Sequence, residues 1–133
     1  MALVVLDSSV VIAFLDPDDA LHEAAVRALT DHRHDQLVIP ATVYAEILVG
    51  PYRRGAKAVT EVEAFLSDLS VRIEILTAAI ARTAARLRSG SRSLRLPDAL
   101  VIATADELAA ERVLTGDESW VRISRRTTLV RAH

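Results

Sequence analysis

The chain has 133 residues, the length of one ordinary domain, and a formal net charge of −2 at pH 7, which argues against a uniformly basic nucleic-acid binder. It contains no cysteine, which excludes disulfides, zinc–thiolate sites, iron–sulfur clusters and cysteine nucleophiles, and fits a reducing compartment. No basic residue precedes the first apolar segment, and the longest apolar run, residues 10–15, is far shorter than the roughly 20 residues that cross a bilayer, so we expect a cytoplasmic protein.

Short apolar runs rich in β-branched residues alternate with segments whose apolar residues recur at helical spacing. From the N-terminus, this pattern predicts a strand at residues 3–6, helices at 10–15 and 20–31, a strand at 37–39, and helices at 41–49 and 56–69. It then predicts a strand at residues 71–75, helices at 78–87 and 99–110, and strands at 113–114 and 128–130. Strands that alternate with helices imply a mostly parallel sheet with helices on both faces. We therefore expect an α/β fold in which residues 1–133 form a single domain.

Several predicted boundaries depend on individual residues. Ser8 and Ser9 are good caps for the helix at residues 10–15. Gly50 and Pro51 are expected to end the helix that begins at residue 41, because proline lacks the N–H that a helix interior needs. Residues 89–95 are rich in glycine, serine and arginine, and are expected to form a mobile loop.

Four acidic residues stand near places where apolar runs meet a predicted helix or turn: Asp7, Glu46, Asp98 and Asp117. Singly, each has a simpler explanation; Asp98, for example, could cap the helix at residues 99–110. Because the strand ends of an open α/β sheet meet along one edge, we expect the four to lie together there. Two carboxylates at roughly 4 Å repel by about 1 kcal/mol in water and by about 4 kcal/mol at an effective dielectric of about 20. Such a cluster is stable if some carboxyls are protonated or a cation lies among them, and carboxylate oxygens suit Mg²⁺ or Mn²⁺.

Four motifs, taken in their order along the chain, resemble those of the PIN domain family. They are Asp7-Ser8-Ser9 after an apolar strand, Glu46 within residues 44–50 (YAEILVG), Asp98 within residues 96–105 (LPDALVIATA), and Thr115-x-Asp117-x-x-Trp120. The resemblance covers essentially the whole chain and is greatest to the VapC branch, the toxin ribonucleases of bacterial and archaeal toxin–antitoxin pairs. It implies a PIN-like three-layer α/β/α sandwich with a short, mostly parallel central sheet.

The resemblance also implies a metal-dependent endoribonuclease that hydrolyses RNA phosphodiester bonds with Mg²⁺, or alternatively Mn²⁺, at the acidic cluster. The implied metal ligands are Asp7, Asp98 and Asp117. Glu46 matches the glutamate that completes the catalytic set, and Ser9 and Thr115 match hydroxyl residues that support the acids. Trp120 stands where phenylalanine is more usual, and we expect it to pack in the interior without affecting activity. The sequence does not distinguish one metal ion from two.

An acidic centre repels the RNA backbone, so we expect basic residues around it. Lys57 is the only lysine, which leaves arginines, the better phosphate ligands, for this role. The candidate RNA-binding residues are Arg88, Arg92, Arg95, Arg122, Arg125 and Arg126. The resemblance further implies an RNA substrate of the tRNA or rRNA class, a cognate VapB-like antitoxin and a homodimer, with no membrane association. The apolar faces of the helices at residues 20–31 and 56–69 could line one of these protein interfaces or could pack in the core.

The main alternative is a non-catalytic PIN-like module that binds RNA or protein without cleaving it. The intact acidic set argues against this alternative, because a degenerate member is expected to lose metal ligands first. Two further enzyme classes place an aspartate after the first strand. Phosphotransferases with a D-x-D motif need a second acid at the position of Ser9, and receiver domains need a late lysine, whereas Lys57 lies in the middle of the chain.

Overall fold

The computed structural model describes residues 1–132 and confirms the predicted α/β fold. Its strands form one parallel sheet in the order β3-β2-β1-β4-β5. They are β1 (Leu3–Leu6), β2 (Gln36–Pro40), β3 (Arg72–Glu74), β4 (Arg112–Thr115) and β5 (Thr127–Leu129). β1 lies at the centre, where Val5 pairs with Val38 of β2 on one side and with Val113 of β4 on the other. All strands therefore direct their carboxyl ends toward the same edge of the sheet.

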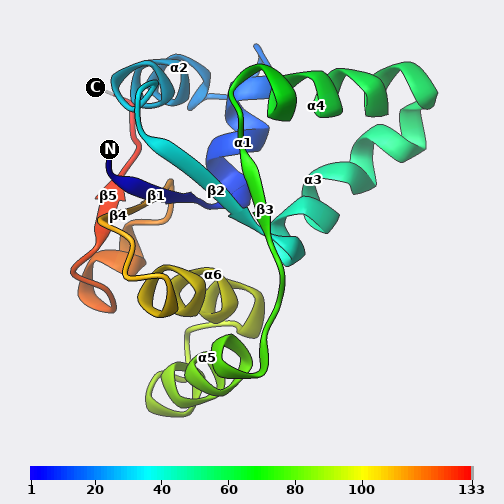
Figure 1. Ribbon diagram of the computed structural model, residues 1–133. Coiled ribbons are helices and arrows are strands. Elements are labelled where there is room, and N and C mark those ends of the chain that lie inside the picture. The colour runs from blue at the N-terminus through cyan, green and yellow to red at the C-terminus, as the bar shows by residue number, and fades with distance from the viewer. Residues whose placement is uncertain (133) are drawn as a thin grey trace.

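Helices cover both faces of this sheet (Figure 1). They are α1 (Ser8–Leu15), α2 (His22–Asp31), α3 (Ala41–Arg54), α4 (Ala56–Asp68), α5 (Ala78–Gly90) and α6 (Leu96–Glu107), with a 3₁₀-helix, η1 (Glu118–Arg122), between β4 and β5. α1 and α2 lie on one face, and α6 lies on the other with α5 packed outside it. α3 and α4 form a helical hairpin that extends to the side beyond β3. None of the helices in residues 1–132 has both the length and the apolar character that crossing a bilayer requires.

The core is built from segments that are apolar on both faces, as expected for the strands of a parallel sheet. In β1, Val4, Val5 and Leu6 are fully buried. α6 buries residues 101–105 in succession, so the middle of this helix is surrounded by protein on all sides. Trp120 of η1 is also buried, as expected from its place in the last motif. This packing fixes the strand ends and the start of α6 relative to each other.

Three helices begin at other residues than the sequence predicted: α2 begins two residues later, at His22, and α1 and α6 begin earlier. Asp7, rather than Ser8 or Ser9, is the N-cap of α1, and its carboxylate accepts a hydrogen bond from the Ser8 N–H at 2.8 Å. α6 begins at Leu96 with Arg95 as its N-cap residue, so Asp98 lies in the first turn and is not the cap. These shifts leave the side chains of the two serines and of Asp98 available for contacts outside their own helices.

The predicted end of α3 at residue 49 is wrong, because the helix continues through Gly50 and Pro51 to Arg54. Proline removes one helical hydrogen bond, but Pro51 is buried, and its packing offsets that loss. α3 ends at Gly55, whose φ of 120° favours glycine and whose N–H donates to the Pro51 carbonyl at 3.0 Å. α5 also extends further than predicted, to Gly90, so the expected loop at residues 89–95 is reduced to residues 91–95.

Candidate active site

Asp7 lies directly after β1, at the carboxyl edge of the sheet, and the residue is only 6% exposed. One carboxylate oxygen, Oδ2, accepts hydrogen bonds from the hydroxyls of Ser9 and Thr115, each at 2.8 Å. The other oxygen, Oδ1, accepts from the Ser8 N–H. Burial raises the pKa of Asp7 above its ordinary value, while the hydrogen bonds from Ser9 and Thr115 act in the opposite direction. The site thus holds a desolvated carboxylate in one orientation.

The hydroxyls that hold Asp7 also join the end of β1 to the turn after β4. The Thr115 hydroxyl accepts from the Asp117 N–H at 3.1 Å, and the Ser9 hydroxyl accepts from the Gly116 N–H at 3.0 Å. A Cβ at Gly116 would lie 2.8 Å from the Leu21 Cδ1 atom, so only glycine fits here without displacing that side chain. Ser9 and Thr115 therefore contact the first acid as the family resemblance implied.

Glu46 and Asp98 approach the same edge from helices. The Ser8 hydroxyl donates to Glu46 Oε2 at 3.2 Å, which links α3 to the start of α1. The Asp98 side chain is 23% exposed and forms an ion pair with Arg95, with 3.7 Å between Asp98 Oδ2 and Arg95 Nε. Desolvation is the largest cause that raises the pKa of Glu46 and of Asp98, and the negative charge of Asp7 raises both further.

Asp117 follows β4 and caps η1. Its Oδ1 atom accepts from both the N–H and the hydroxyl of Ser119, at 2.9 and 2.6 Å. The side chain is otherwise exposed to solvent. The negative charge of Asp117 contributes to raising the pKa of Asp7 and of Asp98, so the fourth acid is electrostatically coupled to the others.

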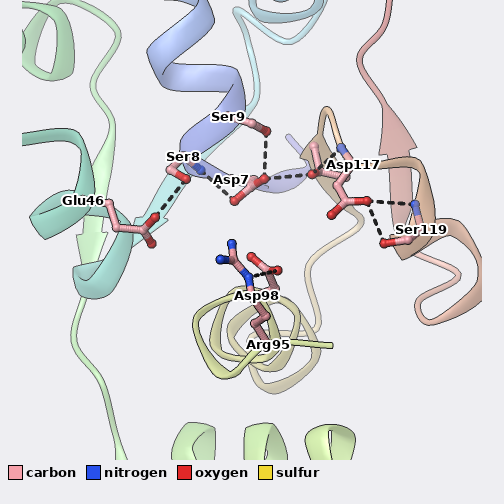
Figure 2. A network of polar contacts seen from close by, with 9 residues as sticks. Asp7, Ser8, Ser9, Glu46, Arg95, Asp98, Asp117 and Ser119 are labelled. Carbon is pink, nitrogen blue, oxygen red and sulfur yellow. Dashed lines mark hydrogen bonds and ion pairs between the residues drawn. The ribbon is translucent and has the colours of Figure 1, made fainter. Parts of the chain in front are cut away.

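The four carboxylates face a common space (Figure 2). They reach it from the ends of β1 and β4 and from α3 and α6, which lie far apart in the sequence. The predicted convergence of Asp7, Glu46, Asp98 and Asp117 is therefore found in the structure. Among the described residues, however, no three acidic or histidine side chains stand close enough together to hold a metal ion.

The donor set nevertheless suits a hard divalent cation. All four candidate ligands are carboxylates, and mutual repulsion contributes to the raised pKa of Asp7, Glu46 and Asp98, which a cation among them would relieve. Glu46 and Asp117 are exposed, so their side chains have room to turn toward a bound ion. The donor chemistry suits Mg²⁺ or Mn²⁺, but the side chains as placed would have to move closer together to coordinate the ion, with Asp7 as the fixed member.

The predicted RNA-binding arginines lie in different places. Arg95 is beside Asp98, and Arg88 and Arg92 are exposed in the last turn of α5 and in the short segment that leads to α6. Arg126 pairs with Asp106 at 3.1 Å and also donates to the Ala110 carbonyl.

Arg126 and the adjacent Arg125 precede β5, so they lie at the amino edge of the sheet, opposite the acids. Arg122 is exposed at the end of η1. Of the predicted arginines, Arg88, Arg92 and Arg95 lie in the segment that leads to the start of α6.

Two supporting residues lie outside the set that the sequence predicted. Ser8 is expected from sequence only to cap a helix, but its hydroxyl binds Glu46. Ser119 lies two residues after Asp117, a spacing at which a serine commonly bonds back to an aspartate, and this signal could have identified it. The contact between Ser8 and Glu46 joins residues 38 apart in the sequence, and no local pattern predicts it.

A cleft of about 440 Å³ lies between α1, α3 and α4 and reaches one of the four acids, Glu46. Its lining includes Ile12, Ile47 and Val62, together with the charged side chains of Glu46 and Arg54. Of the two helices expected to offer an apolar face, α4 contributes to this cleft and α2 does not. A partner bound in the cleft would contact Glu46 directly.

A family model described as the PIN domain matches residues 4–126. Among solved structures, the chain is similar to a toxin–antitoxin complex from Klebsiella pneumoniae, with a TM-score of 0.77 and 22% identity over 98% of this chain and 99% of that chain. It is similar to VapBC2 from Rickettsia felis bound to a DNA fragment from their promoter, with a TM-score of 0.76 and 16% identity over 98% and 97% of the two chains. It is also similar to Mycobacterium tuberculosis VapC20, a sarcin–ricin loop cleaving toxin, with a TM-score of 0.73 and 23% identity over 90% and 93%. No curated protein matches the sequence.

Proposed function

The chain belongs to the PIN domain family, and from that premise we propose that it is a metal-dependent endoribonuclease, the toxin of a VapBC-type toxin–antitoxin pair. The observation that carries this proposal is the convergence of four carboxylates from separate segments on one edge of the sheet. Capping of α1 accounts for the hydrogen bond from the Ser8 N–H, but not for the two hydroxyls, of Ser9 and Thr115, that also hold this desolvated carboxylate. Polar side chains buried at a cost in stability are typical of catalytic sites.

The surroundings of each acidic residue suit it to a different role in catalysis. A divalent cation held by Asp7, Asp98 and Asp117 would activate water at neutral pH and screen the phosphate oxygens. Asp7 fixes the geometry, because its three hydrogen bonds leave it no freedom to turn. Ser8 occupies Glu46 Oε2 and leaves Oε1 free. The pKa of Glu46 is raised, which suits this carboxylate to accept the proton that the attacking water loses.

Several features support an RNA substrate and a protein inhibitor. VapC20 is described as a toxin that cleaves the sarcin–ricin loop, and other similar structures are toxin–antitoxin complexes. We propose that this chain acts on structured RNA of the tRNA or rRNA class in the cytoplasm. A VapB-like antitoxin is proposed to occupy the cleft between α1, α3 and α4, where it would cover Glu46.

A homodimer is also part of this proposal. Exposed apolar side chains on α3 and in and after β3 support it, namely Val49, Tyr52, Ile73, Ile75 and Leu76. Light scattering after size-exclusion chromatography would measure the mass in solution. A monomer at high protein concentration would contradict the dimer without affecting the nuclease proposal.

The decisive experiment is a cleavage assay on total tRNA and rRNA with purified protein, Mg²⁺ or Mn²⁺, and an EDTA control. We expect cleavage that requires the metal and that Asp98→Asn reduces by at least about a hundredfold, because the substitution removes a charged ligand while leaving the fold intact. Asp18→Asn makes the same chemical change in an exposed turn and serves as the matched control. Circular dichroism would establish that both variants fold. A folded Asp98→Asn protein with normal cleavage would favour a non-catalytic RNA- or protein-binding module instead.

A further inference from the structure

Arg95 carries its charge into the acidic site. It is the N-cap residue of α6, but its side chain makes no capping hydrogen bond and is 79% exposed, so it has no evident structural task. Its guanidinium extends from the start of α6 into the space between Glu46 and Asp98, facing Asp7 (Figure 2). Within residues 1–132, Arg95 is the one basic side chain that forms an ion pair with any of the four acids.

This contact neutralises part of the site but holds the arginine only loosely. The positive charge of Arg95 lowers the pKa of Glu46 and of Asp98, against the stronger causes that raise both. The separation of 3.7 Å between Arg95 Nε and Asp98 Oδ2 is too long for a hydrogen bond, and the pair is open to solvent on the arginine side. Exposed ion pairs of this kind contribute between about 0 and 1 kcal/mol, so a stronger cation displaces them readily.

A divalent cation and the guanidinium cannot both occupy the site without repelling each other. The divalent ion carries twice the charge and binds carboxylate oxygens directly, so at a high enough concentration it displaces the guanidinium from the carboxylates. We propose that Arg95 is a built-in counter-ion that competes with the divalent cation for the acidic site, so that it sets the metal concentration at which the enzyme becomes loaded. This inference rests on the proposed function, because it takes the acidic cluster to be a metal site.

The test is a titration of RNA-free protein with Mn²⁺. Binding is measured by calorimetry and by the rise in melting temperature that the metal causes. Arg95→Gln removes the competing charge and is expected to tighten Mn²⁺ binding about three- to tenfold, the effect of one unit charge about 6 Å from a divalent ion in partly screened solvent. Arg95→Lys keeps the charge and is expected to bind Mn²⁺ as the wild type does. Arg92→Gln makes the same change at an exposed position three residues earlier, and is expected to have little effect.

An Arg95→Gln variant that binds Mn²⁺ no more tightly than the wild type would overturn the inference. An equal gain in Arg92→Gln would overturn it as well, because the effect would then reflect net charge alone. The titration needs no RNA, so it separates the two proposals. A wild-type protein that never cleaves RNA but shows the Arg95-specific gain would support the counter-ion and contradict the nuclease.

Discussion

At the scale of single residues, two threonines have buried hydroxyls, but only one of these hydroxyls forms hydrogen bonds. Thr115 is fully buried and its hydroxyl both donates to Asp7 and accepts from the Asp117 N–H. The hydroxyl of Thr42 is also buried, but it has no hydrogen-bond partner. A buried polar atom contributes to stability only when it is paired, and costs free energy when it is not. The same substitution should therefore change stability in opposite directions at the two positions.

Thr115→Val is expected to lower the free energy of unfolding by about 1–3 kcal/mol, because the Asp117 N–H loses its acceptor and the Asp7 carboxylate loses a donor. Thr42→Val removes an unpaired hydroxyl at nearly constant volume and is expected to raise the free energy of unfolding by about 1 kcal/mol. Urea unfolding of both variants would measure the two changes. Equal losses of stability at the two positions would contradict this account, and cleavage should fall only in Thr115→Val.

The pH dependence of stability follows from the carboxyl groups of the site. Burial and the charges of Asp7 and Asp98 raise the pKa of Glu46 in the folded protein above its value in the unfolded chain. The folded state therefore binds the Glu46 proton more readily, so this group destabilises the fold when it is ionised. The loss of stability caused by ionised Glu46 is greatest above the pKa of Glu46 in the folded protein. It shrinks as the pH falls through that pKa and vanishes below the pKa of Glu46 in the unfolded chain.

Glu46→Gln is accordingly expected to be more stable than the wild type at pH 7, while the hydrogen bond from Ser8 is retained. The gain should shrink as the pH is lowered and disappear in acid, because glutamine does not titrate. Urea unfolding of both proteins at pH 7 and at about pH 4, near the ordinary pKa of glutamate, would measure it. RNA cleavage is expected to fall by about a hundredfold, since the proton acceptor is lost. A gain in stability that persists unchanged in acid would assign the effect to packing rather than to charge.

At the scale of elements, the central strands and α6 could be predicted from sequence because their continuous apolar runs are buried on both sides. The end of α3 could not. Local rules make Gly50 and Pro51 a helix stop, and only the burial of Pro51 against the rest of the protein overrides them. The actual stop at Gly55 depends on a backbone angle, φ 120°, that the sequence does not reveal.

A comparison of two glycines distinguishes the need for a positive φ from the entropy that any glycine loses when the chain folds. Gly55 has φ 120°, and a Cβ added there would meet no atom within 4 Å, so Gly55→Ala meets backbone strain but no clash. We expect it to lower the free energy of unfolding by about 1–3 kcal/mol, because this extended backbone conformation at positive φ is essentially restricted to glycine. Gly90 ends α5, also has open space around it and has no positive φ, so Gly90→Ala is expected to stabilise by about 0.4–1 kcal/mol. Thermal unfolding would compare the two; a stabilised Gly55→Ala variant would show that the joint between α3 and α4 is not strained.

At the scale of the whole molecule, the parallel sheet explains why the site could be anticipated from acids that are distant in sequence. Residues that follow parallel strands meet at one edge, and Asp7 and Asp117 follow the neighbouring strands β1 and β4. The same rule predicts at which edge of the sheet each arginine lies, but only once it is known whether the arginine precedes or follows a strand. Arg126 precedes β5 and therefore lies at the opposite edge, whereas Arg95 opens the helix that carries Asp98. Charge alone did not distinguish the two.

The arginines can be sorted experimentally by the salt dependence of cleavage. Arg88 and Arg92 are exposed near the start of α6. Replacing both with glutamine is expected to lower kcat/KM and to reduce the slope of log(kcat/KM) against log[salt] by about 1.4–1.8, the range for two phosphate contacts on single-stranded or duplex nucleic acid. Arg126→Gln should leave that slope unchanged, because Arg126 is bound to Asp106 and the Ala110 carbonyl at the other edge. It should instead lower the free energy of unfolding by about 1 kcal/mol. An unchanged slope in the double variant, or a reduced slope in Arg126→Gln, would mean that RNA crosses a different face from the one on which α6 begins.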